Sequence, residues 1–172
     1  YYVYDGTGQR VRKLTENQAD AGATPGKKDE RLYIGAYELY KNENGLERES
    51  LHIMDDKQRI AMLDTETEPR RILGIPAGRT TPVRTLRYQL GNHLGSVSLE
   101  LDENAEVISY EEYHPYGTTA YQARNASMKA AGKRYRYTGM ERDEETGLEY
   151  HSARYYVVWL GRWCSGDPIG VR

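Results

Sequence analysis

The stretch SVSLELDENAEVISYEEY, residues 96–113, alternates apolar with polar residues on both sides of a short acidic turn. In an extended chain Val97, Leu99 and Leu101 fall on one side, and the Ser and Glu between them fall on the other. Residues 102–105 supply the Asp and Asn side chains that favour a tight turn. The stretch therefore predicts a β-hairpin with one apolar face and one wet face.

The same order of strand, Asp/Asn turn and strand recurs along the chain. Arrays of hairpins bury little surface per unit, gain stability by lying side by side, and leave strand edges unpaired. We therefore expect a mainly β fold, an array of antiparallel hairpins that forms one arc of a larger sheet. The other turns and strands that carry this prediction are the turn Asp5–Gly8 inside YYVYDGTGQRVRKL, the strands Leu32–Tyr40 and Leu46–Met54 with the turn Asn42–Gly45 between them, and the turn Asp55–Lys57 before QRIAMLDTE.

Three segments depart from this pattern. Residues 15–30 are polar with Gly, Pro and Ala and show no periodicity, which predicts a loop. Residues 68–84 contain three prolines, which central strands exclude, and so predict an extended surface connection. Residues 121–131 predict one short helix, ended by Gly132.

The hydrophobic content is low for a compact globular protein of one domain. The 172 residues are 29% charged and 38% hydrophobic, with sixteen Tyr, two Trp and no Phe. A tyrosine ring buries apolar area while its hydroxyl keeps a polar partner, so this usage suits sheets with thin or wet faces. The net charge of -2 does not indicate a basic surface that would bind nucleic acid or an acidic membrane.

The sequence gives no support for a disulfide, a metal site, a membrane span or a secretory signal. A single cysteine, Cys164, excludes an internal disulfide and is expected to be a small buried hydrophobe. The four histidines are far apart, so we expect no metal site and no cofactor. No apolar run is long enough to span a membrane, and the opening YYVYDGTGQR is not a secretory signal. It begins inside a strand pattern without Met, and we expect the chain to be part of something longer.

The opening repeat and the last forty residues carry a resemblance to a known family. YVYDGTGQRVRK resembles the tyrosine-aspartate unit of RHS/YD-repeat proteins, and the segment from residue 136 onward resembles the RHS repeat-associated core domain. The resemblance covers essentially the whole chain and is most like Tc toxin C-components and polymorphic toxins. It divides the chain into a YD-repeat array at 1–133 and an RHS-associated core segment at 134–172. The residues of the core motif are Arg142, Asp143, Gly147, Leu148, Arg154, Tyr155, Tyr156, Gly161, Arg162, Trp163, Pro168 and Gly170.

The resemblance implies a hollow shell. In this family a β-ribbon winds into the shell, the core segment turns inward to plug one end, and a toxic C-terminal domain is held inside in poorly folded form. The implied partners are the rest of the RHS shell, that toxin domain, and a B-component or secretion-system partner. The implied destination is outside the producing bacterium, reached through a toxin or secretion system.

The motif residues allow structural and functional interpretations. Residues 141–147 predict a solvated turn in which Arg142 pairs with a neighbouring acid, rather than a catalytic carboxylate. Arg154 is expected to stack among tyrosines rather than to bind phosphate. Trp159 and Trp163, four residues apart, are expected to be core anchors, with a sugar-binding platform as the alternative.

Asp167 is the one residue with a chemical interpretation. The resemblance implies that this Asp, next to Pro168, forms half of a self-cleavage dyad with a second Asp further on, and two carboxyl groups that share a proton can hydrolyse a bond. The partner Asp is absent here, so we expect no enzyme activity from this chain and treat Asp167 as a turn residue. Three functions stay open: a toxin-encapsulating shell, the non-toxic half of a self-cleaving aspartyl peptidase, and a surface carbohydrate-binding repeat module.

Overall fold

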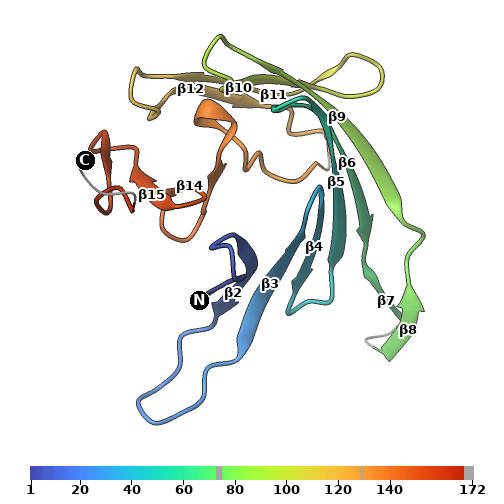
Figure 1. Cartoon of the computed structure of the whole chain (residues 1–172). Helices are drawn as coiled ribbons and strands as arrows, with labels where there is room; N and C mark the ends of the chain where they lie inside the picture. Colours follow the sequence, from blue (N-terminus) through green and yellow to red (C-terminus); the bar gives the residue numbers. More distant parts are fainter. Residues whose placement is uncertain (73–74, 129, 169–172) are drawn as a thin grey trace. The chain divides into compact units, whose positions relative to one another are not determined.

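In the computed structural model, which describes residues 1–72, 75–128 and 130–168, the chain is almost entirely antiparallel β-structure (Figure 1). One short 3₁₀ turn, η1 (Tyr137–Gly139), is the only helical element among these residues. The predicted hairpin-based β fold is confirmed. The strands are β1 (Tyr2–Tyr4), β2 (Arg10–Glu16), β3 (Lys27–Ile34), β4 (Tyr37–Asn42), β5 (Glu47–Asp55), β6 (Gln58–Thr67), β7 (Pro69–Ile72), β8 (Ile75–Arg79), β9 (Val83–Gly91), β10 (Val97–Leu101), β11 (Val107–Tyr113), β12 (Thr119–Arg124), β13 (Glu141–Arg142), β14 (Glu149–His151), β15 (Arg154–Val157) and β16 (Arg162–Trp163).

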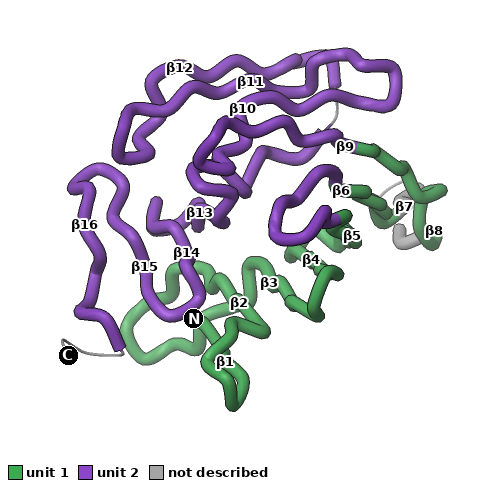
Figure 2. Tube along the Cα trace, turned by 45° about the horizontal axis from the view of Figure 1, so that its top comes forward, with its two compact units in different colours: residues 1–53, 62–86 green, residues 54–61, 87–172 purple. Residues whose placement is uncertain are grey.

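Two compact units make up the chain (Figure 2). Unit 1 comprises residues 1–53 and 62–86, and unit 2 comprises residues 54–61 and 87–172. In unit 1 the strands hydrogen-bond in the order β1-β2-β3-β4-β5-β6, and β7-β8 form a separate pair. In unit 2 the order is β9-β10-β11-β12, and β13-β14-β15-β16 form a separate sheet. The boundary expected between residues 133 and 134 stays a prediction.

One five-residue turn that begins with Asp or Asn closes four of the hairpin connections. The backbone N–H of its first residue donates to the carbonyl of the fifth, and the N–H of the fourth donates to the carbonyl of the first. The first side chain, always Asp or Asn, accepts from further backbone N–H groups of the turn, which satisfies them without a neighbouring strand. The fourth residue has positive φ in every copy and is Gly in three of them and Ala105 in the other. The turns are residues 5–9, 42–46, 92–96 and 102–106.

The buried face of the strands is polar, although the polar face was predicted to be wet. Among the side chains that the structure describes, eighteen polar or charged residues are buried against seven hydrophobic ones. On β5, Ser50 and His52 are buried while Leu51 lies exposed between them. On β9, Arg87 is buried and Tyr88 is exposed. The period-2 alternation was predicted correctly, but the face predicted to be wet is the buried one, because paired charges occupy it.

The helix predicted at residues 121–131 is wrong. Residues 119–124 form β12, which pairs antiparallel with β11, and a turn follows at residue 125. Tyr121 lies opposite Glu112, and its ring contacts that of Tyr110 with 6.2 Å between centroids. Helix propensity is a weak preference, and cross-strand pairing at the end of the sheet overrides it here.

The two predicted loops are shorter than expected, since strands enter both of them. β2 runs to Glu16 and β3 starts at Lys27, which leaves residues 17–26 between strands. Residues 68–84 contain the β7-β8 pair and the start of β9, so this connection is a small hairpin rather than a purely extended segment. The strand expected at residues 32–40 is also divided, by a turn at Gly35, where φ is +60°.

Candidate functional site

Glu111 on β11 is the centre of a buried ionic cluster in unit 2. Lys133 Nζ lies 2.9 Å from its Oε2 atom, and Arg136 Nη1 lies 3.1 Å from its Oε1 atom. Thr119 on β12 donates to Oε1 at 2.6 Å. Lys133 also donates to the carbonyl of Val97 at 2.6 Å. Through these contacts residues 133–136 are fixed to β10, β11 and β12.

Glu100 on β10 forms a second buried cluster beside the first. Arg87 on β9 pairs with its Oε2 atom, and Gln89 donates to its Oε1 atom at 3.0 Å. Ser109 on β11 also donates to Oε2, at 2.6 Å. A further hydrogen bond, from Arg87 Nη1 to the carbonyl of Ala131, connects this cluster to the segment that follows β12. The contacts of Arg87 and Glu100 therefore connect β9, β10 and β11 with the segment that follows β12.

The surroundings of both glutamates favour their charged forms. Burial alone would raise the pKa of Glu100, but Arg87, Ser109 and Gln89 outweigh it and hold the pKa below its ordinary value. Burial likewise opposes ionisation of Glu111. Its hydrogen bonds and the nearby charges of Lys133 and Arg136 nevertheless lower the pKa.

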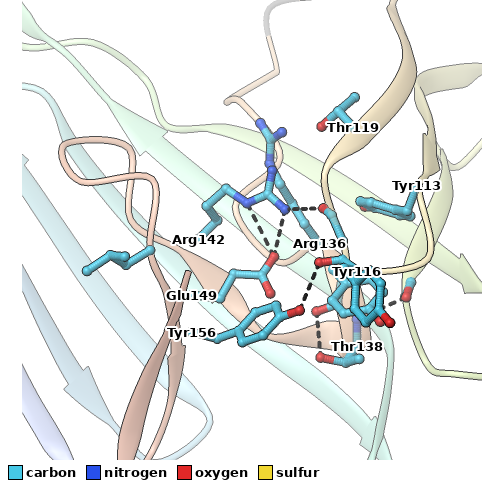
Figure 3. A network of polar contacts seen from close by, with 12 residues as sticks. Tyr113, Tyr116, Thr119, Arg136, Thr138, Arg142, Glu149 and Tyr156 are labelled. Atoms are coloured by element: carbon cyan, nitrogen blue, oxygen red, sulfur yellow. Dashed lines mark hydrogen bonds and ion pairs between the residues drawn. The ribbon is translucent and has the colours of Figure 1, made fainter. Parts of the chain in front are cut away.

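Arg142, which pairs with Glu149 inside the small C-terminal sheet, connects that sheet to the loop between β11 and β12. Figure 3 shows the two side chains facing each other, and Arg142 Nη2 lies 2.8 Å from Glu149 Oε1. The same guanidinium donates to the carbonyl of Gly117 at 2.7 Å. Tyr156 on β15 donates to the carbonyl of Tyr116 at 3.1 Å. These contacts make strands β13–β15 part of the same polar interface.

The turn predicted at residues 141–147 is present, but it is not uniformly solvated. Gly147, with φ of +72°, donates its N–H to the carbonyl of Asp143 at 2.7 Å. Glu141 and Asp143 are buried, which contradicts the prediction of a solvated charge run for these two residues. Leu148 is half-buried at the end of the turn. Arg142 does pair with an acid, although the partner lies on the next strand.

Arg154 contacts a tryptophan where tyrosines were expected. Its guanidinium carbon lies 4.2 Å from the centre of the Trp163 ring, and its Nη2 atom lies 3.0 Å from Asp167 Oδ2. Tyr155 contacts Tyr150 instead, with 5.4 Å between centroids, and Tyr156 packs against Trp163 at 5.3 Å. The predicted cation–π stacking is therefore present with a different ring.

Trp159, Trp163 and Cys164 are exposed, so the predictions that placed them in a core are wrong. The two tryptophans are 56% and 42% exposed. Their spacing of four does not describe a helical turn, since Trp159 lies in the turn before β16 and Trp163 lies in β16 itself. Gly161, with φ of +61°, reverses the chain between them and packs against Tyr116, while Arg162 is exposed on β16.

Asp167 and Pro168 lie exposed near the end of the described residues. The Asp167 side chain is 47% exposed and pairs with Arg154, and Gly170 lies outside the described residues. Across residues 1–72, 75–128 and 130–168 no three His, Cys, Asp or Glu side chains are grouped so as to hold a metal ion. No helix in that part of the chain is long and apolar enough to cross a membrane.

The ionic residues that organise this site were not predicted from the sequence. Glu100 was assigned to the wet face of its hairpin because charged residues are usually exposed, and Glu111 and Arg87 were assigned no role. A usable signal was present: Arg87 and Glu100, which carry opposite charges, lie on neighbouring strands at positions that alternate with apolar residues. Lys133 had no comparable signal, because it follows the last strand of the array and its partner is distant in sequence.

Comparisons with known proteins place homologues of this chain among toxin subunits. No family model matches it. It is 34% identical over 176 residues to toxin subunit YenC1 of Yersinia entomophaga, an alignment that covers 99% of this chain and 17% of that protein. The crystal structure of TcdB2-TccC3 matches with a TM-score of 0.76 at 34% identity, over 99% of this chain and 8% of the other. The structure of the Photorhabdus luminescens Tc holotoxin pore matches with a TM-score of 0.75, again over 99% of this chain and 8% of the other.

These relatives share the fold along nearly the full length of the chain. The chain spans only 17% of the curated relative. Homologues of this chain are therefore Tc toxin subunits, and the chain corresponds to one part of such a subunit.

Proposed function

We propose that this chain is part of the RHS-repeat shell of a Tc-type toxin C-component, and that the shell encapsulates a C-terminal toxic polypeptide and helps to deliver it. The observation that carries this proposal is the match over 99% of the chain to TccC-type and YenC-type toxin subunits. In this proposal residues 1–133 form YD-repeat wall and residues 134–172 form the RHS-associated segment that closes it.

The ionic interface supports the closing role of the C-terminal segment. A wall with solvent on one side and a chamber on the other has little room for a dry apolar core. Directional pairs such as Lys133 with Glu111 fix a segment in one position, which non-directional apolar contacts do less well. The proposed partners are the rest of the RHS shell, the enclosed polypeptide, and a B-component or secretion-system partner that completes delivery outside the producing cell.

Limited proteolysis of the full-length protein tests the proposal. We expect the polypeptide that follows the shell to resist protease in the wild type and to be degraded when Glu111→Lys detaches the closing segment. Glu112→Lys is the matched control, because Glu112 is exposed on the next position of the same strand. Equal protection in all three proteins, or no protection in the wild type, would contradict the proposal.

A second candidate function, one half of a self-cleaving aspartyl peptidase, rests on the pairing of Asp167 with Arg154 at 3.0 Å. A guanidinium that pairs with a carboxylate fixes its position, as one member of a catalytic pair requires. Intact mass of the full-length protein distinguishes the two functions: cleavage in the wild type and in the loop variant Asp20→Asn, but not in Asp167→Asn, is expected for the peptidase. An uncleaved wild type removes this candidate and leaves the shell proposal standing.

A further inference from the structure

β12 is an exposed edge strand in unit 2. It pairs with β11 on one side and stands last in the strand order, so its other side has no neighbouring strand among the described residues. Four of its six residues are exposed. Edge strands are commonly protected against pairing with another chain by Pro or Lys, and the sequence TAYQAR of β12 contains neither. β12 is therefore open to the addition of a further strand.

The backbone of β12 offers donors and acceptors along this free edge. Asn125 donates its N–H to the carbonyl of Ile108 on β11, and the pairing with β11 is regular from Tyr121 to Arg124. Alternate residues of an antiparallel strand point their N–H and C=O groups to opposite sides. Gln122 and Arg124 therefore direct these groups away from β11, where they meet no partner in the part of the chain that the structure describes.

A row of polar side chains crosses the sheet and ends at Arg124. Gln89, Glu100 and Ser109 lie opposite one another on β9, β10 and β11. Arg124 lies opposite Ser109 on β12. Glu100 has its counter-charge in Arg87, whereas the exposed Arg124 guanidinium pairs with no carboxylate among the described residues. An acidic side chain would complete the row at its next position.

The opposite face of the same edge is apolar and aromatic. Tyr121 is 55% exposed, with its ring beside that of Tyr110. Ala123 lies opposite Tyr110. A strand added to β12 would direct alternate side chains to the two faces of the sheet. An apolar or aromatic residue would then pack against Tyr121, and an acidic residue would face Arg124.

We propose that the free edge of β12 binds an extended strand from another part of the same toxin subunit, in which acidic and apolar residues alternate. The alignment with YenC1 covers 17% of that protein, so most of such a subunit lies outside it. A strand of the same molecule has a high effective concentration and can pair through a short edge. A separate subunit would need a larger interface, since stable interfaces bury at least about 1,000 Å². The inference does not depend on an enclosed toxin.

Hydrogen exchange resolved to single amides in the full-length protein tests the edge. We expect the amides of Gln122 and Arg124 to exchange at least about 100-fold more slowly than in an unstructured chain, because the added strand accepts their hydrogen bonds. Arg124→Glu brings like charges together and should lower this protection about fivefold, whereas Arg124→Lys should keep most of it. Arg84→Glu makes the same charge change at an exposed position of β9 and should leave the protection unchanged.

Arg124→Lys also allows the added strand to be identified. A carbodiimide activates a carboxylate, the introduced amine displaces the activating group as a urea, and an amide bond joins the two side chains. Peptide mass spectrometry then locates both ends of the cross-link. We expect the carboxylate to belong to an Asp or Glu of the same subunit outside these 172 residues. Thermal unfolding of each variant confirms that it is folded.

Four results would overturn the proposal. Rapid exchange of both amides would show that the edge is open in the full-length protein. Unchanged protection in Arg124→Glu would remove the acidic partner, and a cross-link confined to these 172 residues would remove the added strand. Protection that appears only after another toxin subunit is added would assign the edge to that subunit. A failure of the proteolysis test of the shell leaves these measurements unaffected.

Discussion

Lys133 Nζ and Glu111 Oε2 lie 2.9 Å apart, and the two side chains are 1% and 0% exposed, so a full ion pair is buried between the sheet and the segment that follows it. Removing two charges from water is costly, and a pair of this kind is stable only when further hydrogen bonds satisfy both groups. Here Val97 and Thr119 provide those bonds. Leaving either charge alone in this position is therefore strongly unfavourable.

The first prediction concerns this pair. Glu111→Gln leaves Lys133 and Arg136 without a counter-charge and should lower the free energy of local opening of residues 130–142 by about 3 kcal/mol. Hydrogen exchange of the full-length protein measures that free energy. Glu112→Gln, one position along the strand and exposed, should change it by less than about 0.5 kcal/mol. Equal effects of the two substitutions would contradict the assignment of Glu111 as the centre of the cluster.

Gly117 gives a prediction about close packing. Its φ is +93°, and a side-chain carbon at this position would lie 2.6 Å from the Tyr137 ring. Gly117→Ala therefore adds a steric clash to backbone strain of about 1–2 kcal/mol. Gly8 has φ of +81° with nothing within 4 Å, so Gly8→Ala measures the strain alone. Urea unfolding should show a clearly larger loss for Gly117→Ala, and similar losses would mean that Tyr137 moves aside freely.

Ala105 gives a prediction of stabilisation. It occupies the fourth position of a recurrent turn with φ of +62°, where the other three copies have Gly. Ala105→Gly removes that strain and should raise stability by about 0.5–1 kcal/mol, less the entropy that glycine adds to the unfolded chain. Ala123→Gly, in the extended backbone of β12, should lower stability instead. Thermal unfolding midpoints that move in the same direction for both variants would contradict this explanation.

The Glu100 and Glu111 clusters predict that the stability of the fold decreases at acidic pH. The pKa values of Glu100 and Glu111 lie below the ordinary value of 4.5, so between the folded and unfolded pKa the unfolded chain binds more protons. The stability that they contribute is fully present above pH 4.5 and is lost as the pH falls through the folded pKa. Unfolding midpoints measured from about pH 6 down to about pH 3 should fall more steeply for the wild type than for Glu111→Gln, after allowance for the lower starting stability of the variant.

Turns and strands could be predicted because their signals are local. An Asp or Asn at the first position of a turn bonds to backbone groups two and four residues on, so residues 102–106 define their turn whatever lies around them. The helix expected at 121–131 failed for the opposite reason. Whether these residues form a helix or a strand depends on β11, which pairs with them and places Tyr110 against Tyr121.

The site was less predictable than the fold, because its contacts join distant residues and because burial of charge is exceptional. Arg142 was expected to pair with a neighbouring acid, and it does pair with one, but only the fold identifies Glu149 on the next strand and the carbonyl of Gly117 as its partners. Arg154 was expected to stack on an aromatic ring, and it does so, but identifying Trp163 as that ring required the fold. A residue type indicates the kind of contact, while the partner depends on tertiary structure.

The polar interior also affects how the stability of the chain varies with temperature. Exposure of apolar surface on unfolding raises the heat capacity, whereas exposure of polar surface lowers it. A chain that buries far more charged and polar side chains than hydrophobic ones should therefore unfold with a small heat-capacity change for its length. Its stability then varies little with temperature on either side of the maximum, so this chain should keep its fold over an unusually broad range of temperatures.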